Sequence, residues 1–120
     1  MPVTNVGSKF FTESTSLTTT SQTTVYTVPP NYSAIVKLFI ASNTDSSNRN
    51  VTVSWYHADD ASTHTIIGNH AVTGNTFESF IDANRPLYLH TGDILYATAG
   101  TANVLQITVS VEEYYDPNRG

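Results

Sequence analysis

The stretch of residues 86–113 constrains the fold most strongly, because it reads as a succession of antiparallel strands. Its last part alternates strictly between polar and apolar residues, the apolar ones being Leu105, Ile107, Val109 and Val111. A period of two is typical of a strand that is buried on one face. Turn residues at 91–93 and 99–101 separate this strand from two earlier ones. We therefore expect a β-meander against which the rest of the chain packs.

Similar short runs recur upstream, at spacings of about ten residues. They predict strands at residues 25–28, 33–43, 51–56, 63–73 (broken at 68–69) and 77–81. Trp55 should be a large core element of the third of these strands. The predicted class is all-β: a single antiparallel two-sheet sandwich or jelly roll of about eight short strands, with an extended N-terminal arm.

The chain of 120 residues fits one domain, which we place at residues 23–113, followed by a C-terminal tail at 114–120. Residues 1–22 form a Ser/Thr-rich arm, since the run 12–24 is almost entirely Thr and Ser and cannot bury enough apolar area to fold alone. Terminal segments are ordered when something ties them down. We expect the arm to lie against another subunit; the alternative is that it docks back on its own domain.

Charge and composition exclude several partners. Charged residues make up 12% of the chain, the formal net charge is −5, and the five basic residues are scattered, so there is no footprint for nucleic acid. No apolar run approaches the roughly 20 residues that span a bilayer. The N-terminus lacks the apolar core of a secretory signal, so we expect assembly in a cytoplasm. There is no cysteine, which excludes disulfides and thiolate metal sites.

His57, Asp59, Asp60 and His64 lie within eight residues and are the strongest candidates for binding a divalent metal. Their spacing is not a typical ligand spacing, and the segment is also a plain polar turn whose aspartates bond backbone amides. We predict no metal site, and the sequence leaves open whether the four residues converge. A jelly-roll oxygenase would need paired histidines along one strand, which His70 and the later His90 do not provide.

No catalytic motif is present. The sequence has neither a Gly-x-Ser-x-Gly elbow nor a glycine-rich phosphate loop. Glu112 and Glu113 are adjacent on an extended strand, where side chains point to opposite faces, so they make a poor acid/base pair. We expect no catalytic residue, no cofactor and no enzymatic activity.

Exposed apolar side chains are the more informative feature. The strand at 33–43 is apolar on both faces, with Ile35, Lys37 and Phe39 opposite the face of Val36, so a neighbour should cover it. Tyrosines near strand ends supply rigid anchors at a protein interface or stack on sugar rings in a carbohydrate-binding module. The predicted interface residues are Phe10, Phe11, Leu17, Ile35, Phe39, Tyr114 and Tyr115.

Several segments together resemble small β-sandwich virion proteins of tailed bacteriophages. They are VYTVPP at 25–30, NYSAIVKLFIASN at 31–43, VTVSW at 51–55, PLYLHTGDILYATAG at 86–100 and VLQITVSVEEY at 104–114. The shared motifs lie at residues 26–29, 40–43 and 89–95, and the resemblance covers roughly 23–113. The chain departs from the family at Pro29, Pro30 and Asn31, where members often carry a glycine.

The resemblance implies a non-enzymatic, homo-oligomeric structural role in the virion. Such proteins recur as capsid decoration (cement) proteins, often trimers, and as neck or tail components. The resemblance does not say where on the particle the protein sits. Our leading hypothesis is a capsid decoration protein that stabilises the shell through subunit contacts, with the major capsid protein or other virion proteins as partners. The alternatives are a neck, tail or fibre component, and a carbohydrate-binding β-sandwich module.

Overall fold

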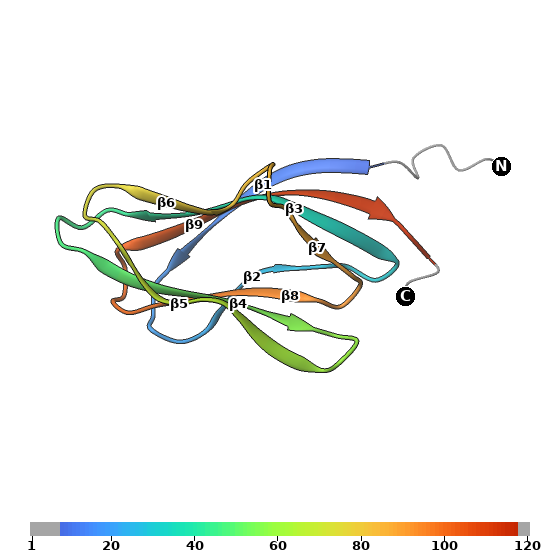
Figure 1. The fold of residues 1–120 in the computed structure, drawn as a ribbon, viewed down its shortest axis with the longest axis horizontal. Coiled ribbons are helices and arrows are strands. Elements are labelled where there is room, and N and C mark those ends of the chain that lie inside the picture. The colour runs from blue at the N-terminus through green and yellow to red at the C-terminus, as the bar shows by residue number, and fades with distance from the viewer. Residues whose placement is uncertain (1–7, 118–120) are drawn as a thin grey trace.

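A computed structural model of the chain describes residues 8–117, which form nine strands in two facing sheets (Figure 1). Sheet A has the order β1-β9-β3-β6, with β7 also paired to β3, and sheet B has the order β2-β8-β4-β5. Sheet A contains β1 (Ser8–Leu17), β3 (Tyr32–Asn43), β6 (Phe77–Ile81), β7 (Leu87–Leu89) and β9 (Leu105–Tyr115). Sheet B contains β2 (Thr23–Thr27), β4 (Arg49–His57), β5 (Ser62–Val72) and β8 (Ile94–Ala99). The predicted all-β jelly roll is confirmed.

The core lies between the two sheets and takes side chains from both. Alternate residues of β9 point inward, as the strict period of two predicts, and the opposing layer comes mainly from β4 and β8. Fully buried members include Phe39, Val53, Leu95, Leu105 and Ile107. Trp55 packs against this core but is only partly buried, at the end of the sandwich.

The expected meander of residues 86–113 is wrong in its pairing, although its three strands are present. β7 pairs with β3 in sheet A, β8 pairs with β2 and β4 in sheet B, and β9 returns to sheet A between β1 and β3. Both turns therefore carry the chain from one sheet to the other. Periodicity reveals which residues form a strand, but the same pattern fits a hairpin and a crossing between sheets.

The predicted faces of β3 are corrected by a β-bulge at Lys37. Val36 pairs with Val111 and Leu38 with Ser110, so β3 contains one residue more than β9 over this step. The extra residue lets Val36 and Phe39 both point inward, although they are three positions apart. Phe39 is consequently a core residue, and Leu38 lies on the outer face.

The expected arm is largely part of the sandwich. Residues 8–17 form β1, which pairs in register with β9 from Ser8–Tyr114 to Leu17–Leu105. The Ser and Thr side chains, which gave this segment the appearance of a low-complexity linker, form hydrogen bonds with hydroxyls on β9. Thr12 Oγ1, for example, lies 2.8 Å from Ser110 Oγ. The segment thus follows the alternative of docking on its own domain. Residues 1–7 and 118–120 lie outside the described residues.

The turns β2–β3, β4–β5 and β7–β8 gather at one end of the sandwich, on the right in Figure 1. That end also receives the C-terminal part of β9, because the Asp116 N–H donates to the Asn31 carbonyl. Within residues 8–117, no helix is long and apolar enough to cross a membrane.

Candidate interaction surface

The outer face of sheet A carries a row of side chains that crosses four strands. Phe10 on β1 is paired with Glu112 on β9, Glu112 with Ile35 on β3, and Ile35 with Tyr88 on β7. Directly paired residues of antiparallel strands project from the same face. Phe10 is 61% exposed and Tyr88 65% exposed, so this is the face turned away from the core. We call Phe10, Ile35, Tyr88 and the adjacent Tyr114 the aromatic row.

Polar contacts hold the middle of the aromatic row in place. Glu112 is only 8% exposed, and its Oε1 lies 3.4 Å from the ammonium of Lys37, the bulge residue. The same ammonium lies 5.5 Å from the ring centroid of Phe10, a cation–π distance. A hydrogen bond to Glu112 raises the pKa of the Tyr114 hydroxyl. The row therefore presents apolar and aromatic surface around a neutralised carboxylate.

A surface hollow of about 260 Å³ lies beside the row. Its lining includes Tyr88, Tyr114 and Ile35, with polar groups from Ser33 and Asp116. The hollow thus adjoins three members of the aromatic row.

The structure divides the predicted interface residues into three groups. Phe10, Ile35 and Tyr114 share the outer face of sheet A. The remaining four are placed elsewhere: Phe11, Leu17, Phe39 and Tyr115. Leu17 and Phe39 are fully buried in the core of the chain, so the expectation that they contact a partner is wrong for this fold.

The side chains of Phe11 and Tyr115 pack against other aromatic residues of the same chain. Phe11 points inward, and its ring centroid lies 6.0 Å from that of Tyr26. Tyr115 follows Tyr114 on an extended strand and so points to the opposite face, where it packs edge-on against Tyr32 at 5.6 Å between centroids.

Sequence reasoning missed Tyr88 and Phe77, which are 65% and 64% exposed. The signal for Tyr88 was present: it lies between Leu87 and Leu89, and Leu89 is buried. A strand whose leucine points inward turns the residue before it outward. Phe77, on β6, pairs with Ser42 on β3 and lies outside the aromatic row.

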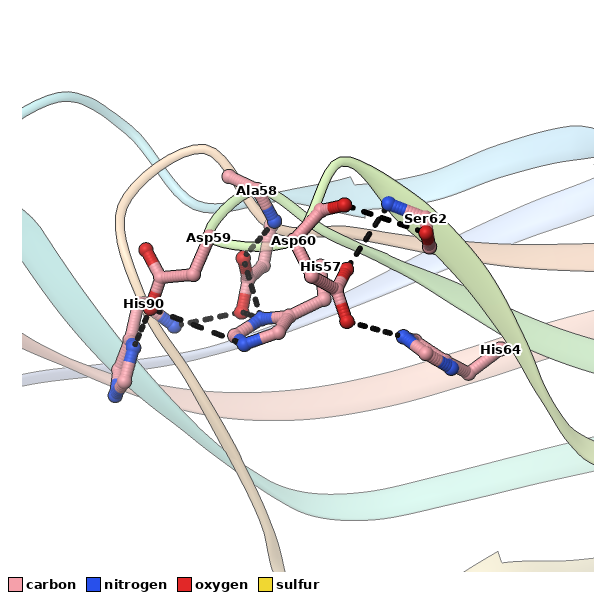
Figure 2. Close-up of polar contacts among 8 residues, drawn as sticks. His57, Ala58, Asp59, Asp60, Ser62, His64 and His90 are labelled. Carbon is pink, nitrogen blue, oxygen red and sulfur yellow. Dashed lines mark hydrogen bonds and ion pairs between the residues drawn. The ribbon is translucent and has the colours of Figure 1, made fainter.

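A second feature is a cluster of histidines and aspartates on the β4–β5 and β7–β8 turns (Figure 2). Its centre is Asp93, which is almost fully buried. The Asp93 carboxylate accepts hydrogen bonds from the backbone N–H of Ala58 at 2.8 Å and of His90 at 2.9 Å. It also lies 3.3 Å from Nδ1 of His57. Asp93 thus fastens the two turns to each other.

The exposed side of the same cluster contains two further carboxylates. Asp59 Oδ2 lies between two imidazoles, 3.3 Å from Nδ1 of His90 and 3.8 Å from Nε2 of His57 (Figure 2). Asp60 Oδ2 lies 3.0 Å from Nε2 of His64. Desolvation opposes ionisation of Asp60, but the hydrogen bonds from His64 and the Ser62 N–H outweigh it and lower the pKa of this carboxyl.

The question that the sequence left open is therefore answered: His57, Asp59, Asp60 and His64 do converge, and His90 joins them. Trp55 completes the group, with its ring centroid 4.8 Å from that of His57 and 5.4 Å from that of His64. Within residues 8–117, no group of three or more His, Cys, Asp or Glu side chains could hold a metal ion. The fourth histidine, His70, lies away from the cluster, 3.5 Å from Glu78.

No protein-family model matches the sequence, and no curated protein is significantly similar to it. Among solved structures, the fold is similar to a chain of the T13 particle of infectious bursal disease virus, with a TM-score of 0.53 and 13% identity. A mutant VP2 protein of the same virus in T=1 particles matches with a TM-score of 0.51 and 13% identity. Both matches cover 93% of this chain and 32% of the viral chain.

A third similar structure is a chain of the disulfide-linked pili that form Bacillus endospore appendages. It has a TM-score of 0.46 and 12% identity, and the match covers 97% of this chain and 96% of the pilus chain.

At these identities the similarity to the viral chains shows the fold alone. The chain is a jelly-roll β-sandwich of the kind found within the capsid chains of viral particles. It spans about a third of the length of the viral chains that it matches.

Proposed function

We propose that this chain is a non-enzymatic structural protein of a virion, namely a capsid decoration (cement) protein of the kind found in tailed bacteriophages. The observation that carries the proposal is the aromatic row, an exposed apolar surface on the outer face of one sheet of the jelly roll. Large exposed apolar side chains grouped on one face mark an interaction site. Phe10, Tyr88 and Tyr114 belong to the residue types from which interface anchors are drawn.

The chemistry around the row fits a protein neighbour. Beyond Phe10, the outer face continues into hydroxyl pairs such as Thr12–Ser110 and Ser14–Thr108, which can form the polar rim of an interface. Each fully buried anchor contributes about 1.5–3 kcal/mol relative to the exposed state. A partner that binds the assembled shell and not its free subunits stabilises the shell by mass action. The proposed partners are the major capsid protein, or other virion proteins, and further copies of this chain in a trimer.

Localisation on particles tests this proposal. Virions produced with the gene for this chain should carry it in many copies on the capsid lattice, as seen by cryo-electron microscopy. Replacing both Phe10 and Tyr88 by serine should reduce occupancy strongly, whereas Phe77→Ser, which alters an equally exposed aromatic residue outside the row, should not. Density at the neck, tail or fibres would support the alternative location, and virions without the protein would contradict a structural role.

The hollow beside the row favours one second candidate, a carbohydrate-binding module. Tyr88 and Tyr114 flank it and Asp116 lines it, which combines aromatic faces with a carboxylate that accepts hydrogen bonds from hydroxyls. A glycan array probed with the purified protein separates the two functions. Binding that is lost in Tyr114→Ala would favour the carbohydrate module, and a blank array would favour the protein interface.

A further inference from the structure

We propose that the free edge of β1 binds the same edge of a second copy of this chain, the partner subunit. The two β1 strands run antiparallel about a two-fold axis at Phe11, so that sheet A continues from one copy into the other. The contact lies at the edge of sheet A and depends neither on the aromatic row nor on a place in a virion. A strand at an edge presents unpaired backbone N–H and C=O groups, and these are what an added strand binds.

Among the strands that end a sheet in the described part of the chain, β1 alone is both long and regular. It pairs with β9 over ten residues without a shift in register. At the other edge of sheet A, β6 and β7 have five and three residues. In sheet B, the pairing of β2 shifts after Thr24 and that of β5 shifts twice. Short strands and bulges hinder pairing with another chain, so β1 is the edge that a second copy can extend.

The charged side chains of β1 are self-complementary in one register. Lys9 and Glu13 lie on the same face of the strand, with Phe11 halfway between them. In an antiparallel pair centred on Phe11, Lys9 is opposite Glu13 of the partner subunit, and the symmetry repeats this ion pair. A pair centred on Lys9 or on Glu13 would place like charges opposite each other, which is unfavourable. Charge therefore selects a second copy as the partner and also selects the register.

Glu13 has no basic partner within its own chain. None of the Lys and Arg side chains among residues 8–117 forms an ion pair with it. Lys9 is available to a neighbour, because its side chain is 71% exposed and its ammonium is 4.0 Å from the nearest carboxylate oxygen of Glu113. Pairing across the edge thus gives Glu13 the cation that its own chain does not supply.

A surface hollow of about 500 Å³ lies along this edge, where β1 and β2 border the same side of the sandwich. Lys9, Phe11 and Glu13 line it from β1, and Tyr26 and Thr27 line it from β2. A two-fold axis at Phe11 places the hollows of the two copies opposite each other, with the two Phe11 rings between them. An aromatic pair directly opposite across two strands adds to the stability of the pairing.

The contact is small, since only residues 8–14 of each copy pair in this register. We expect a Kd on the order of 0.1–1 mM, because so short an edge buries less area than a standard interface. In dilute solution the contact is therefore largely open, and it forms where copies are held close together. The outer face of sheet A stays accessible, because the pairing runs along the edge of the sheet and not over its face.

Sedimentation equilibrium of the full-length protein at concentrations up to about 2 mM tests the proposal. The weight-average mass of the wild type should rise with concentration. Lys9→Glu and Glu13→Lys each place like charges opposite each other in both halves of the contact, so each should weaken the association at least about tenfold. The double variant Lys9→Glu/Glu13→Lys should associate like the wild type.

An equal mixture of Lys9→Glu and Glu13→Lys is the sharpest control. Each variant alone is repelled by its own copy, but in the mixture every charged position faces one of opposite sign, so association should return. Because this rescue needs both variants to be folded, it separates lost pairing from lost structure. Ser16→Glu, which adds a charge to β1 beyond the paired residues, should leave the association unchanged.

The proposal fails if the wild type shows no rise in mass at the highest concentration, or if the mixture associates no more than its two components. It also fails if Lys9→Gln/Glu13→Gln associates more tightly than the wild type. That result would show that the two charges keep this edge from pairing, as charged side chains on edge strands can do.

Discussion

The hydroxyl of Tyr26 donates a 2.6 Å hydrogen bond to Oε2 of Glu113, and this bond ties the two sheets together. Tyr26 lies on β2 of sheet B and Glu113 on β9 of sheet A, and both side chains are buried. The ammonium of Lys9 lies 4.0 Å from Oε1 of the same carboxylate, and the Lys9 side chain is largely exposed. Glu113 therefore depends on the tyrosine for its main buried partner.

Replacing Tyr26 by phenylalanine should lower the free energy of unfolding by about 1–3 kcal/mol, because it leaves a buried carboxylate oxygen without its donor. Urea denaturation followed by the fluorescence of Trp55 measures this loss. The matched control is Tyr88→Phe, which removes a hydroxyl from an exposed ring and should change stability by less than about 0.5 kcal/mol. Equal losses in both variants would show that the Tyr26–Glu113 hydrogen bond contributes no more to the free energy of unfolding than an exposed tyrosine hydroxyl does.

The same pair predicts a dependence of stability on alkaline pH. Burial, the hydrogen bond to Glu113 and its negative charge all raise the pKa of Tyr26 above its usual value. In the unfolded chain a tyrosine ionises near pH 10. Above about pH 10 the folded state thus binds more protons than the unfolded state, and stability falls as pH rises, by at most about 1.4 kcal/mol per pH unit from this group.

Urea midpoints at pH values between about 9 and 11 test this pH dependence. The wild type should lose stability more steeply than Tyr26→Phe, in which this contribution is absent at every pH. Tyr114, whose pKa is also raised, is present in both proteins and cancels in the comparison. Parallel curves would contradict the prediction.

The bulge at Lys37 predicts that β3 tolerates one deletion and not another. Without Lys37, Val36 would point inward, Leu38 outward and Phe39 inward, which is a regular strand with unchanged core residues. Deleting Lys37 should therefore preserve a cooperative unfolding transition, at the cost of the ion pair with Glu112. Circular dichroism and urea denaturation give the outcome.

Deleting Ile40 is the matched control for that experiment. It would turn Ala41 and Asn43 outward and bring Ser42 into the core, so the variant should lose its cooperative transition. If both deletions gave the same stability, the bulge would not be the feature that sets the register.

Asn43 at the end of β3 anchors the loop that follows it. Its buried amide donates to the carbonyls of Ser47 at 2.8 Å and Val72 at 2.9 Å, and its oxygen accepts from the Asp45 N–H. Asn43→Ala should lower the free energy of unfolding by on the order of 3 kcal/mol, since it orphans these backbone groups. Asn84→Ala, an exposed asparagine in a turn, is the control for urea denaturation. A loss below about 0.5 kcal/mol for Asn43→Ala would contradict the anchoring role.

Strand positions and fold class were predictable from the sequence because they depend on local alternation. The pattern of residues 105–112 identifies β9, and β6 spans the predicted residues 77–81. Which strands pair was not predictable, because a turn such as the one at Gly92 serves equally to form a hairpin or to cross between sheets. The bulge at Lys37 was hidden for a related reason: one extra residue reverses the faces without changing the composition of the strand.

The site was predictable only in part. Phe10, Ile35 and Tyr114 are on the outer face of sheet A, but the row that joins them to Tyr88 depends on the order of four strands that are far apart in sequence. His90 shows the same limit. It lies 31 residues from Asp59, and only the crossing of β7 into β8 brings its ring to the β4–β5 turn.

The mass of the purified protein in solution, measured by multi-angle light scattering, tests most directly whether the aromatic row joins copies of this chain in a trimer. We predict a trimer of the 13.1-kDa chain, about 39 kDa, that falls to the monomer mass in Phe10→Ser/Tyr88→Ser and persists in Phe77→Ser. A wild-type protein that remains a monomer at all concentrations would contradict the claim, as would a double variant that keeps the wild-type mass.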